Sequence, residues 1–381
     1  MYVFSCKIEV PFGYCLGGYG DSTADGTNAG GSLNVNGFGF DDLVTTRCIE
    51  VCSIDALYAG DLAMRHVDQR IQRIFAASHT HFAPMLDVTK PRLGRHSPDT
   101  VGAFERAIEG ASRERIVPNS CIVLRGEVKI PVYRRFDFPK SFVNDLLTRY
   151  GGLFPNDAHE VDRGVYIFLF RNGSSNLFAI TYHACHPVTR HNEKAVSADY
   201  VKAIRQGILD RFGTSHSLFF LGCAGDIRPN FANKRVKWLP KSRFNWRFRY
   251  PPTEADQHEA DQQYHNAIYN ANAIASFSVN SSDFFFQLRN LNVKGIGNVL
   301  VPEVYIGNHL RFSFFPFEMS HRFHLSEHSR EMSPTKFIVS CANHTLGYLP
   351  YPDQIPARGY EVDSSRKYMG LTERLMLKRV Y

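Results

Sequence analysis

Short apolar runs that end in chemically reactive side chains recur along this chain and limit the folds that it can adopt. The run at residues 73–77 is followed directly by Ser78-His79-Thr80-His81. In an extended strand, residues i and i+2 point to the same side, so we expect His79 and His81 to project together from the strand end. Two imidazoles placed in this way suggest a metal site or an acid/base pair, with a polar strand end as the alternative.

Strand-like and helix-like segments alternate over most of the sequence. We predict helices at 59–73, 98–116, 198–212 and 254–275, and strands at 46–54, 73–77, 121–132, 165–170, 177–183, 217–223, 284–293, 310–315 and 337–341. This alternation predicts an α/β fold, with one domain spanning residues 1–381, a mixed β-sheet flanked by helices and a metal site at strand ends. The 30 Phe and 18 Tyr favour a strand-rich core lined with rings.

Two segments within this domain have an unusual composition. Residues 15–42 are rich in Gly, Asn, Ser and Asp, and we predict a long loop that either lines a substrate cleft or lies at the surface. Residues 231–252 form a basic and aromatic insertion, and 234–250 hold both tryptophans. We expect this insertion to be either loosely ordered or a flap over an anionic substrate. Single-stranded nucleic acid is the least favoured partner for these side chains.

Net charge and cysteine content narrow the class of protein further. The net charge of +7 suits a small anionic substrate and does not by itself indicate nucleic-acid binding. Eight cysteines occur without a Cys-x-x-Cys motif, so we expect buried free thiols. The N-terminal residues lack a signal-peptide pattern, and no apolar run reaches a membrane-spanning length, so we expect a soluble, cytoplasmic protein.

Four further clusters of reactive side chains follow predicted strands. They are Tyr182–Thr189 with Ser197–Tyr200, Gly222–Asn230, Phe315–Ser320 and Ala342–Pro350. One such coincidence means little, but several in one α/β chain predict a composite active site, because ligands in such folds gather where loops leave the strand ends. Two histidines receive simpler interpretations: His183 is expected to pack at its strand end, and His344 to lie at the surface or behind the site.

The ordered set of motifs resembles the N-terminal domain family of neutral/alkaline (non-lysosomal) ceramidases. The set comprises His-Thr-His, Ala-Cys-His-Pro with a downstream Ser-Ala-Asp, Gly-Asp-x-x-Pro-Asn, a late Phe-Glu, and Asn-x-x-x-Gly-Tyr. Order and spacing agree with the family from about residue 45 to about residue 365.

The resemblance implies one catalytic zinc ion (Zn2+), held by two histidines, a glutamate and a tyrosine. By position these ligands are His79, His186, Glu318 and Tyr348. It places His81 beside the metal, where an imidazole has the pKa range for moving protons. It also implies an arginine that shapes the site, which is Arg135 or, as the second choice, Arg134. Asp199 and Asp226 are expected to orient histidines, and zinc-activated water would attack an amide carbonyl.

The chain departs from the family in one motif. Family members that cleave ceramide have Gly-Asp-x-Ser-Pro-Asn with a catalytically important serine, and this chain has Arg228 at that position. A guanidinium stays protonated and cannot replace a hydroxyl, but it can hold an anion or an oxyanion. The chain is also shorter than secreted ceramidases. We therefore expect a polar or anionic N-acyl substrate, such as an acylated sugar or amino acid, rather than a membrane sphingolipid.

Two other functions stay open at the level of the sequence. One is a non-catalytic, ligand-binding homologue that keeps the fold after losing the serine. Retention of all four expected metal ligands argues against it. The other is a zinc-dependent esterase or phosphoesterase, which the sequence does not separate from an amidase.

Overall fold

A computed structural model of the protein describes most of the chain. The described residues are 1–10, 16–18, 31–43, 45–65, 71–135, 153, 155–191, 194–231, 251–328, 335–357, 359–363 and 376–377. The basic and aromatic stretch at 234–250 lies outside them, so the prediction of a flap there stays a prediction.

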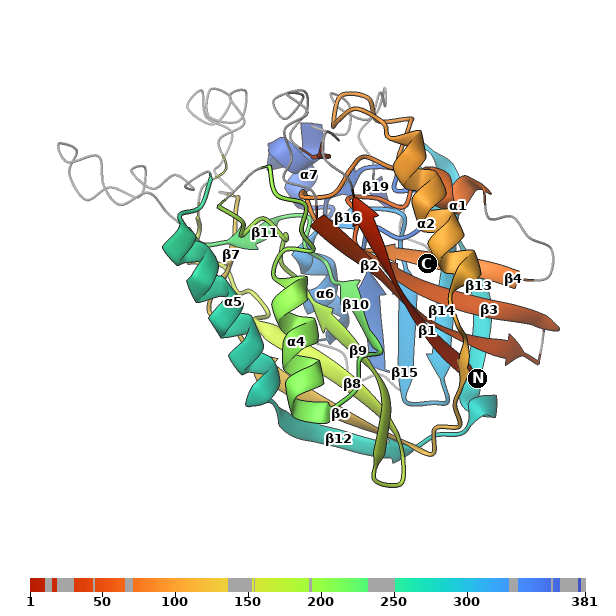
Figure 1. Ribbon diagram of the computed structural model, residues 1–381. Helices are drawn as coiled ribbons and strands as arrows, with labels where there is room; N and C mark the ends of the chain where they lie inside the picture. The colour runs from red at the N-terminus through yellow and green to blue at the C-terminus, as the bar shows by residue number, and fades with distance from the viewer. Residues whose placement is uncertain are drawn as a thin grey trace.

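Three five-stranded sheets form the body of the molecule (Figure 1). In spatial order, the first contains β4 (Ile71–Ala77), β3 (Arg47–Ile54), β2 (Gly31–Asp42), β1 (Tyr2–Val10) and β5 (Glu114–Arg115). The second contains β10 (Ser217–Leu221), β9 (Ser175–His183), β8 (Gly164–Asn172), β6 (Ser120–Glu127) and β12 (Asn272–Ser278). The third contains β17 (Thr335–Val339), β15 (Leu310–Phe314), β14 (Gly297–Ile306), β13 (Phe284–Lys294) and β19 (Met376–Leu377).

Two short ladders and several helices complete the fold. The ladders pair β11 (Ile227–Pro229) with β7 (Pro131–Tyr133) and β16 (Glu318–Met319) with β18 (Tyr348–Leu349). The α-helices are α1 (Asp61–Arg65), α2 (Pro98–Gly110), α4 (Val201–Phe212), α5 (Glu254–Tyr269), α6 (His321–His328) and α7 (Gln354–Ala357). Helices α4 and α5 lie side by side against the second sheet, and α2 packs on β1 of the first (Figure 1). None of the helices in the described ranges has both the length and the apolar composition needed to cross a bilayer.

Each five-stranded sheet contains one parallel strand pair, and its other pairs are antiparallel. The parallel pairs are β3–β4, β9–β10 and β15–β17. The loops that follow β4, β9, β10, β15 and β17 carry the five motifs found in the sequence. The mixed α/β class is thus confirmed, with the strands divided over several sheets. The reactive side chains lie at the carboxyl ends of the strands, as expected for this class.

Phenylalanine rings join the three sheets to one another. Phe38 of the first sheet contacts Phe178 of the second, with ring centroids 5.7 Å apart, and Phe284 of the third at 6.1 Å. Phe168 of the second sheet meets Phe312 of the third at 5.1 Å. All five rings belong to one buried cluster. The aromatic composition therefore forms the strand-rich core that the sequence predicts, and this core fixes the strand ends relative to one another.

The structure corrects the prediction of a loop over residues 15–42. Residues 31–42 form β2, an inner strand of the first sheet, and strands β1 and β14 were not predicted either. The glycines that suggested a loop have another cause. Gly37 and Gly39 pair with Phe4 and Tyr2 of β1, and a Cβ on either glycine would overlap the ring of its partner. Glycine is required at both positions because an aromatic ring from β1 lies directly over the backbone of β2 and leaves no space for a side chain.

All four predicted helices are shorter than expected, and those at 98–116 and 198–212 are reduced to Pro98–Gly110 and Val201–Phe212. The helix at 254–275 ends at Tyr269, and residues 272–278 form the edge strand β12, which pairs with β6. The helix starts at a capping box made by Thr253 and Asp256. Of the segment 59–73, only Asp61–Arg65 is helical in the described residues, and β4 already starts at Ile71.

Candidate metal centre

A sharp turn after β4 aims His79 into the centre of the molecule. Its φ of 64° lies in the left-handed region, and its amide donates to the Ala56 carbonyl at 2.8 Å. The side chain is 1% exposed, and Nδ1 lies 3.0 Å from the Leu57 carbonyl oxygen. A carbonyl only accepts hydrogen bonds, so Nδ1 carries a proton and Nε2 is the ring nitrogen that faces the site.

His186 is oriented in the same way by a different loop. Its Nδ1 lies 2.7 Å from the Ala224 carbonyl oxygen and 2.9 Å from that of Ile227. This arrangement again leaves Nε2 as the ring nitrogen that faces the site. Backbone carbonyls therefore orient both rings, whereas the sequence suggested that Asp199 and Asp226 do so. Backbone carbonyls serve this purpose in metal sites as well as carboxylates do.

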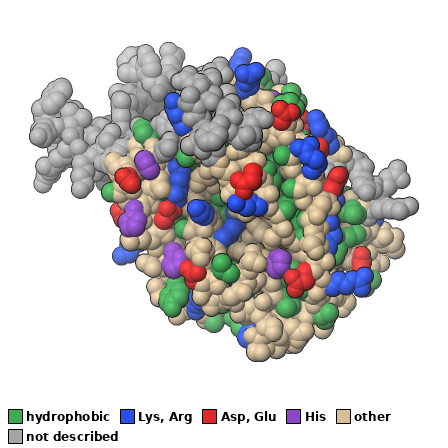
Figure 2. Space-filling view, in the orientation of Figure 1, with side chains coloured by type: hydrophobic (Ala, Val, Ile, Leu, Met, Phe, Trp, Pro, Cys, Tyr) green, Lys and Arg blue, Asp and Glu red, His purple; other side chains and the backbone are tan. Residues whose placement is uncertain are grey.

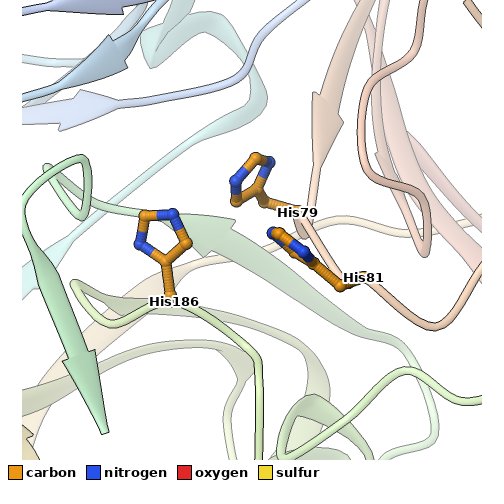
Figure 3. Close-up of side chains that lie close together, drawn as sticks. All are labelled: His79, His81 and His186. Atoms are coloured by element: carbon orange, nitrogen blue, oxygen red, sulfur yellow. The ribbon is translucent and has the colours of Figure 1, made fainter. Parts of the chain in front are cut away.

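His81 completes a group of three histidines whose rings converge (Figure 3). The ring centroid of His79 lies 5.1 Å from that of His81 and 4.9 Å from that of His186. One nitrogen from each ring lies within 4.8 Å of the other two. Gly18 approaches His81 so closely that a Cβ there would overlap the imidazole. Gly18, in the first part of the Gly-rich segment, thus lies against the site.

Glu318 brings a carboxylate to the same point. Its Oε2 lies 3.3 Å from Nε2 of His79 and 3.4 Å from Nε2 of His186. The His79 and Glu318 atoms make no hydrogen bond in the described structure, although both are buried. Tetrahedral zinc with ordinary metal–nitrogen and metal–oxygen distances keeps its ligand atoms about 3.4 Å apart. The two histidines and the glutamate therefore fit a metal ion by type and by spacing.

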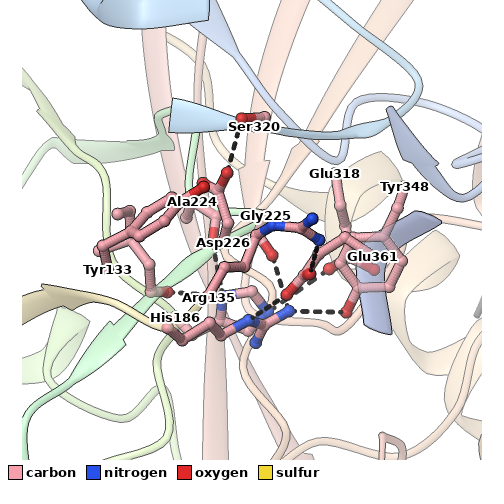
Figure 4. Close-up of polar contacts among 12 residues, drawn as sticks. Tyr133, Arg135, His186, Ala224, Gly225, Asp226, Glu318, Ser320, Tyr348 and Glu361 are labelled. Atoms are coloured by element: carbon pink, nitrogen blue, oxygen red, sulfur yellow. Dashed lines mark hydrogen bonds and ion pairs between the residues drawn. The ribbon is translucent and has the colours of Figure 1, made fainter. Parts of the chain in front are cut away.

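Tyr348 lies beside Glu318 on the neighbouring strand. The parallel pairing of β16 and β18 makes the two residues register partners, and Figure 4 shows their side chains next to each other. The Tyr348 hydroxyl accepts a hydrogen bond from Nη2 of Arg134 at 3.4 Å. Each of the four ligands expected from the resemblance thus lies in one buried neighbourhood.

Burial and nearby charges set the protonation of these groups. Burial and the positive charge of Arg134 lower the pKa of His186 to about 4. Burial together with His79 and His186 holds the pKa of His81 well below its ordinary value. Burial alone would raise the pKa of Glu318, but the two histidines against it hold that pKa well below its usual range. Burial would lower the pKa of His79, but Cys341 and Glu318 raise it well above its ordinary value. Without a metal ion, the centre thus combines an ionised Glu318 and neutral His81 and His186 with a protonated His79, whose Nε2 proton a metal ion would displace.

Two consecutive arginines, Arg134 and Arg135, share the buried carboxylate of Glu361. Figure 4 labels Arg135 and Glu361 of this group. Glu361 accepts from Nε of Arg134 at 2.8 Å and from Nη1 of Arg135 at 2.5 Å. Arg134 also donates to the Gly225 carbonyl at 2.6 Å and reaches Tyr348. Arg134, the second choice in the sequence, is thus the arginine that contacts an expected metal ligand, and Arg135 supports it through Glu361.

The remaining expected site residues lie around the centre. Asp226 accepts from Ser320 Oγ at 2.6 Å, from the His321 amide at 2.7 Å and from Gln354 at 2.8 Å, and so joins three loops. Asp199 holds the backbone of Thr189. The half-buried Arg228 lies on β11, directly after the carbonyl that orients His186.

The two histidines outside the expected site behave differently. His183 is buried between the Gly164 carbonyl oxygen, 2.8 Å from Nδ1, and the Tyr264 hydroxyl, 3.2 Å from Nε2, which confirms its packing role. His344 is half-buried, and its Nδ1 lies 4.0 Å from Asp87. Sequence reasoning missed Tyr58 and Glu361, whose contacts depend on the tertiary structure and carry no local motif.

Comparisons with known proteins extend this description. No family model matches the sequence, and no curated protein matches it. Two solved structures have a similar fold: a ceramidase complexed with C2, and the neutral ceramidase from Pseudomonas aeruginosa. Both comparisons give a TM-score of 0.58 at 12% identity and cover 97% of this chain, against 74% and 73% of the two ceramidase chains. The fold is therefore ceramidase-like.

Proposed function

We propose that this protein is a zinc-dependent hydrolase that cleaves the amide bond of a small, polar or anionic N-acyl compound. One observation carries the proposal: the Nε2 atoms of His79 and His186 and Oε2 of Glu318 converge at ligand spacing inside a ceramidase-like fold. The resemblance of the motifs to the neutral ceramidase family supports the same chemistry.

Four residues would hold the zinc ion, namely His79, His186, Glu318 and Tyr348. When bound, zinc supplies a Lewis acid that polarises the amide carbonyl and acidifies water. The carbonyls behind the two histidines hold the Nδ1 atoms, and so aim both Nε2 atoms at the position of the ion. The ladder between β16 and β18 keeps Glu318 and Tyr348 side by side.

Three cationic or proton-carrying side chains complete the mechanism. His81 lies within ring-contact distance of His79 and would carry a proton to the departing amine. Arg134, supported by Arg135, and Arg228 would stabilise negative charge on the reacting carbonyl or on the substrate. Amide cleavage needs one proton delivered to nitrogen and one removed from water, and a single imidazole can perform both transfers.

The proposed substrate class rests on Arg228. A guanidinium in place of the family's serine favours a substrate with its own negative charge near the scissile bond. The surface adds little to this preference. Figure 2 shows basic and acidic side chains interspersed over the described part of one face, so the net positive charge is not gathered there.

The first test is metal content measured by plasma mass spectrometry. We expect about one zinc per chain in the wild type, loss of zinc in His79→Ala/His186→Ala, and no change in His258→Ala, which alters an exposed histidine on α5. A wild-type protein that takes up no zinc, even after zinc is added back, contradicts the proposal.

The second test separates the reactions. N-acyl amino acids and N-acyl amino sugars are offered beside matched esters and phosphoesters, with and without a chelator. We expect amide hydrolysis that stops when the metal is removed.

The loss of the family's serine also favours a second candidate, a ligand-binding homologue. Tight binding of the N-acyl compounds without turnover would establish that function instead.

A further inference from the structure

The loop that follows β3, at residues 56–58, contacts two of the expected metal ligands, His79 and Glu318. The Ala56 and Leu57 carbonyls accept from the amide and from Nδ1 of His79. The next residue, Tyr58, donates its hydroxyl proton to Oε1 of Glu318 at 2.6 Å. Three consecutive residues thus fix one histidine and the carboxylate, although 260 positions separate Tyr58 from Glu318.

Tyr58 is placed rigidly enough for this task. Its side chain is 2% exposed, and its ring centroid lies 5.3 Å from that of His79. Nζ of Lys90 lies over the ring of Tyr58, 5.4 Å from its centroid. Lys90 is held there by a hydrogen bond from Nζ to Oδ2 of Asp87 at 2.5 Å. A cation placed against an aromatic ring stabilises the ring's position. The phenol donates and the carboxylate accepts in the contact between Tyr58 and Oε1 of Glu318.

The hydrogen bond from Tyr58 gives the two carboxylate oxygens of Glu318 different partners. Oε1 accepts from the phenol, and Oε2 faces the Nε2 atoms of His79 and His186. A carboxylate without such a partner can rotate and offer both oxygens to a metal ion. With Oε1 occupied, only Oε2 is presented to the centre, which suits a four-coordinate ion.

We propose that Tyr58 is a positioning residue of the metal centre, which holds Glu318 so that a single oxygen, Oε2, binds the ion. The inference rests on the proposed function, because it requires that His79, His186 and Glu318 bind a metal. Partners that hydrogen-bond to metal ligands commonly contribute between tenfold and a hundredfold to metal affinity.

The experiment compares Tyr58→Phe with a matched control, Tyr305→Phe. Tyr305 also donates to a buried carboxylate, Oε2 of Glu303 at 2.8 Å, but it lies on β14 in the third sheet. Zinc affinity of each full-length protein is measured by competition with a chromophoric chelator. The visible absorption of the cobalt-substituted protein reports the coordination geometry, and the melting temperature of the metal-free protein reports the fold.

We expect Tyr58→Phe to bind zinc about ten to a hundred times more weakly than wild type, with an altered cobalt spectrum. Tyr305→Phe should keep both properties of the wild type. Unchanged affinity and an unchanged spectrum in Tyr58→Phe would overturn the inference while leaving the proposed function intact. A wild-type protein that binds no zinc would instead overturn the proposed function and this inference with it. If Tyr58→Phe is too unstable to measure, Tyr58→Leu, which is smaller and has no hydrogen-bond donor in its side chain, serves in its place with the same expected results.

Discussion

Glu318 and Tyr348 are register partners in the parallel ladder formed by β16 and β18. The ladder continues through hydrogen bonds from the Glu318 amide to the Gly347 carbonyl at 2.9 Å and from the Ser320 amide to the Leu349 carbonyl at 3.1 Å. Register partners project from the same side of a ladder. Backbone pairing therefore fixes the carboxylate beside the phenol before any metal is bound.

His81 is expected to act on protons and not as a metal ligand. We predict that His81→Ala retains the zinc content of the wild type and that its kcat falls about 10²- to 10⁴-fold, the usual contribution of a general acid or base. Zinc content and steady-state hydrolysis are measured on the same preparation. Loss of zinc together with activity would show that His81 is a ligand, as its ring contacts with His79 and His186 also permit.

Gly225 is expected to maintain the position of the strand that carries Glu318. A Cβ at this glycine would lie 2.8 Å from the carbonyl oxygens of Glu318 and Met319, which are backbone atoms that cannot rotate away. We predict that Gly225→Ala costs about 1–3 kcal/mol in the free energy of unfolding, as other overpacking substitutions do, and weakens zinc binding. Gly110→Ala is the control, because nothing lies within 4 Å of a Cβ at Gly110. Equal urea midpoints for the two variants would contradict this interpretation.

The two adjacent arginines are expected to differ in their effect on catalysis. Lysine keeps the charge but cannot reach Glu361, the Gly225 carbonyl and Tyr348 at once. We predict that Arg134→Lys lowers kcat/KM about tenfold or more, which corresponds to at least about 1.4 kcal/mol of transition-state stabilisation. Arg135→Lys should lower it less. A larger fall of kcat/KM in Arg135→Lys would show that Arg135, the first choice from the sequence, is the arginine that shapes the site.

Glu361 is expected to contribute strongly to stability because it neutralises two buried guanidinium groups. Glu361→Gln leaves Arg134 and Arg135 without this counter-charge. We predict a loss of about 3–5 kcal/mol in the free energy of unfolding, as found when one partner of a buried ion pair is removed. Glu127→Gln, at an exposed ion pair with Arg125, should change it by less than about 0.5 kcal/mol. Urea unfolding at neutral pH measures both variants.

The same carboxylate makes stability depend on pH. Burial would raise the pKa of Glu361, but Arg134 and Arg135 lower it below the ordinary value. A carboxylate with a lowered folded-state pKa stabilises the protein above its unfolded pKa of about 4.3 and loses this contribution as pH falls through the folded pKa. We predict that acidification destabilises the wild type more steeply than Glu361→Gln. Parallel slopes for the two proteins in urea unfolding between pH 7 and pH 3 would disprove the assignment.

The apolar pattern of the sequence locates the strand ends that carry the motifs, and the choice of ligands among the motif residues came from the resemblance to the ceramidase family. His79 follows β4, His186 follows β9 and Glu318 follows β15, and the periodicity of apolar residues locates such strand ends. The same pattern of apolar residues did not predict strand β2. Its glycines look like loop residues until the rings of Phe4 and Tyr2 are seen to cover them.

Other features of the site depend on contacts between distant segments. Nothing near Tyr58 in the sequence indicates a carboxylate partner that lies 260 positions away. Which of two adjacent arginines faces Tyr348 depends on where β7 ends, because successive residues of an extended chain point to opposite sides. The motifs therefore indicate which expected ligands lie together, but they do not reveal the groups that hold those ligands in place.

The order in which the ribosome makes the chain limits when this centre can form. The Ala77 amide donates to the Cys341 carbonyl at 3.2 Å and the Asn343 amide to the Phe75 carbonyl at 2.7 Å, so the turn that carries His79 is completed by residues near the other end of the sequence. A nascent chain can present His79 and His186 long before Glu318 and Tyr348 have been synthesised. A metal ion held by the four proposed ligands can therefore be bound completely only after residue 348 has been translated.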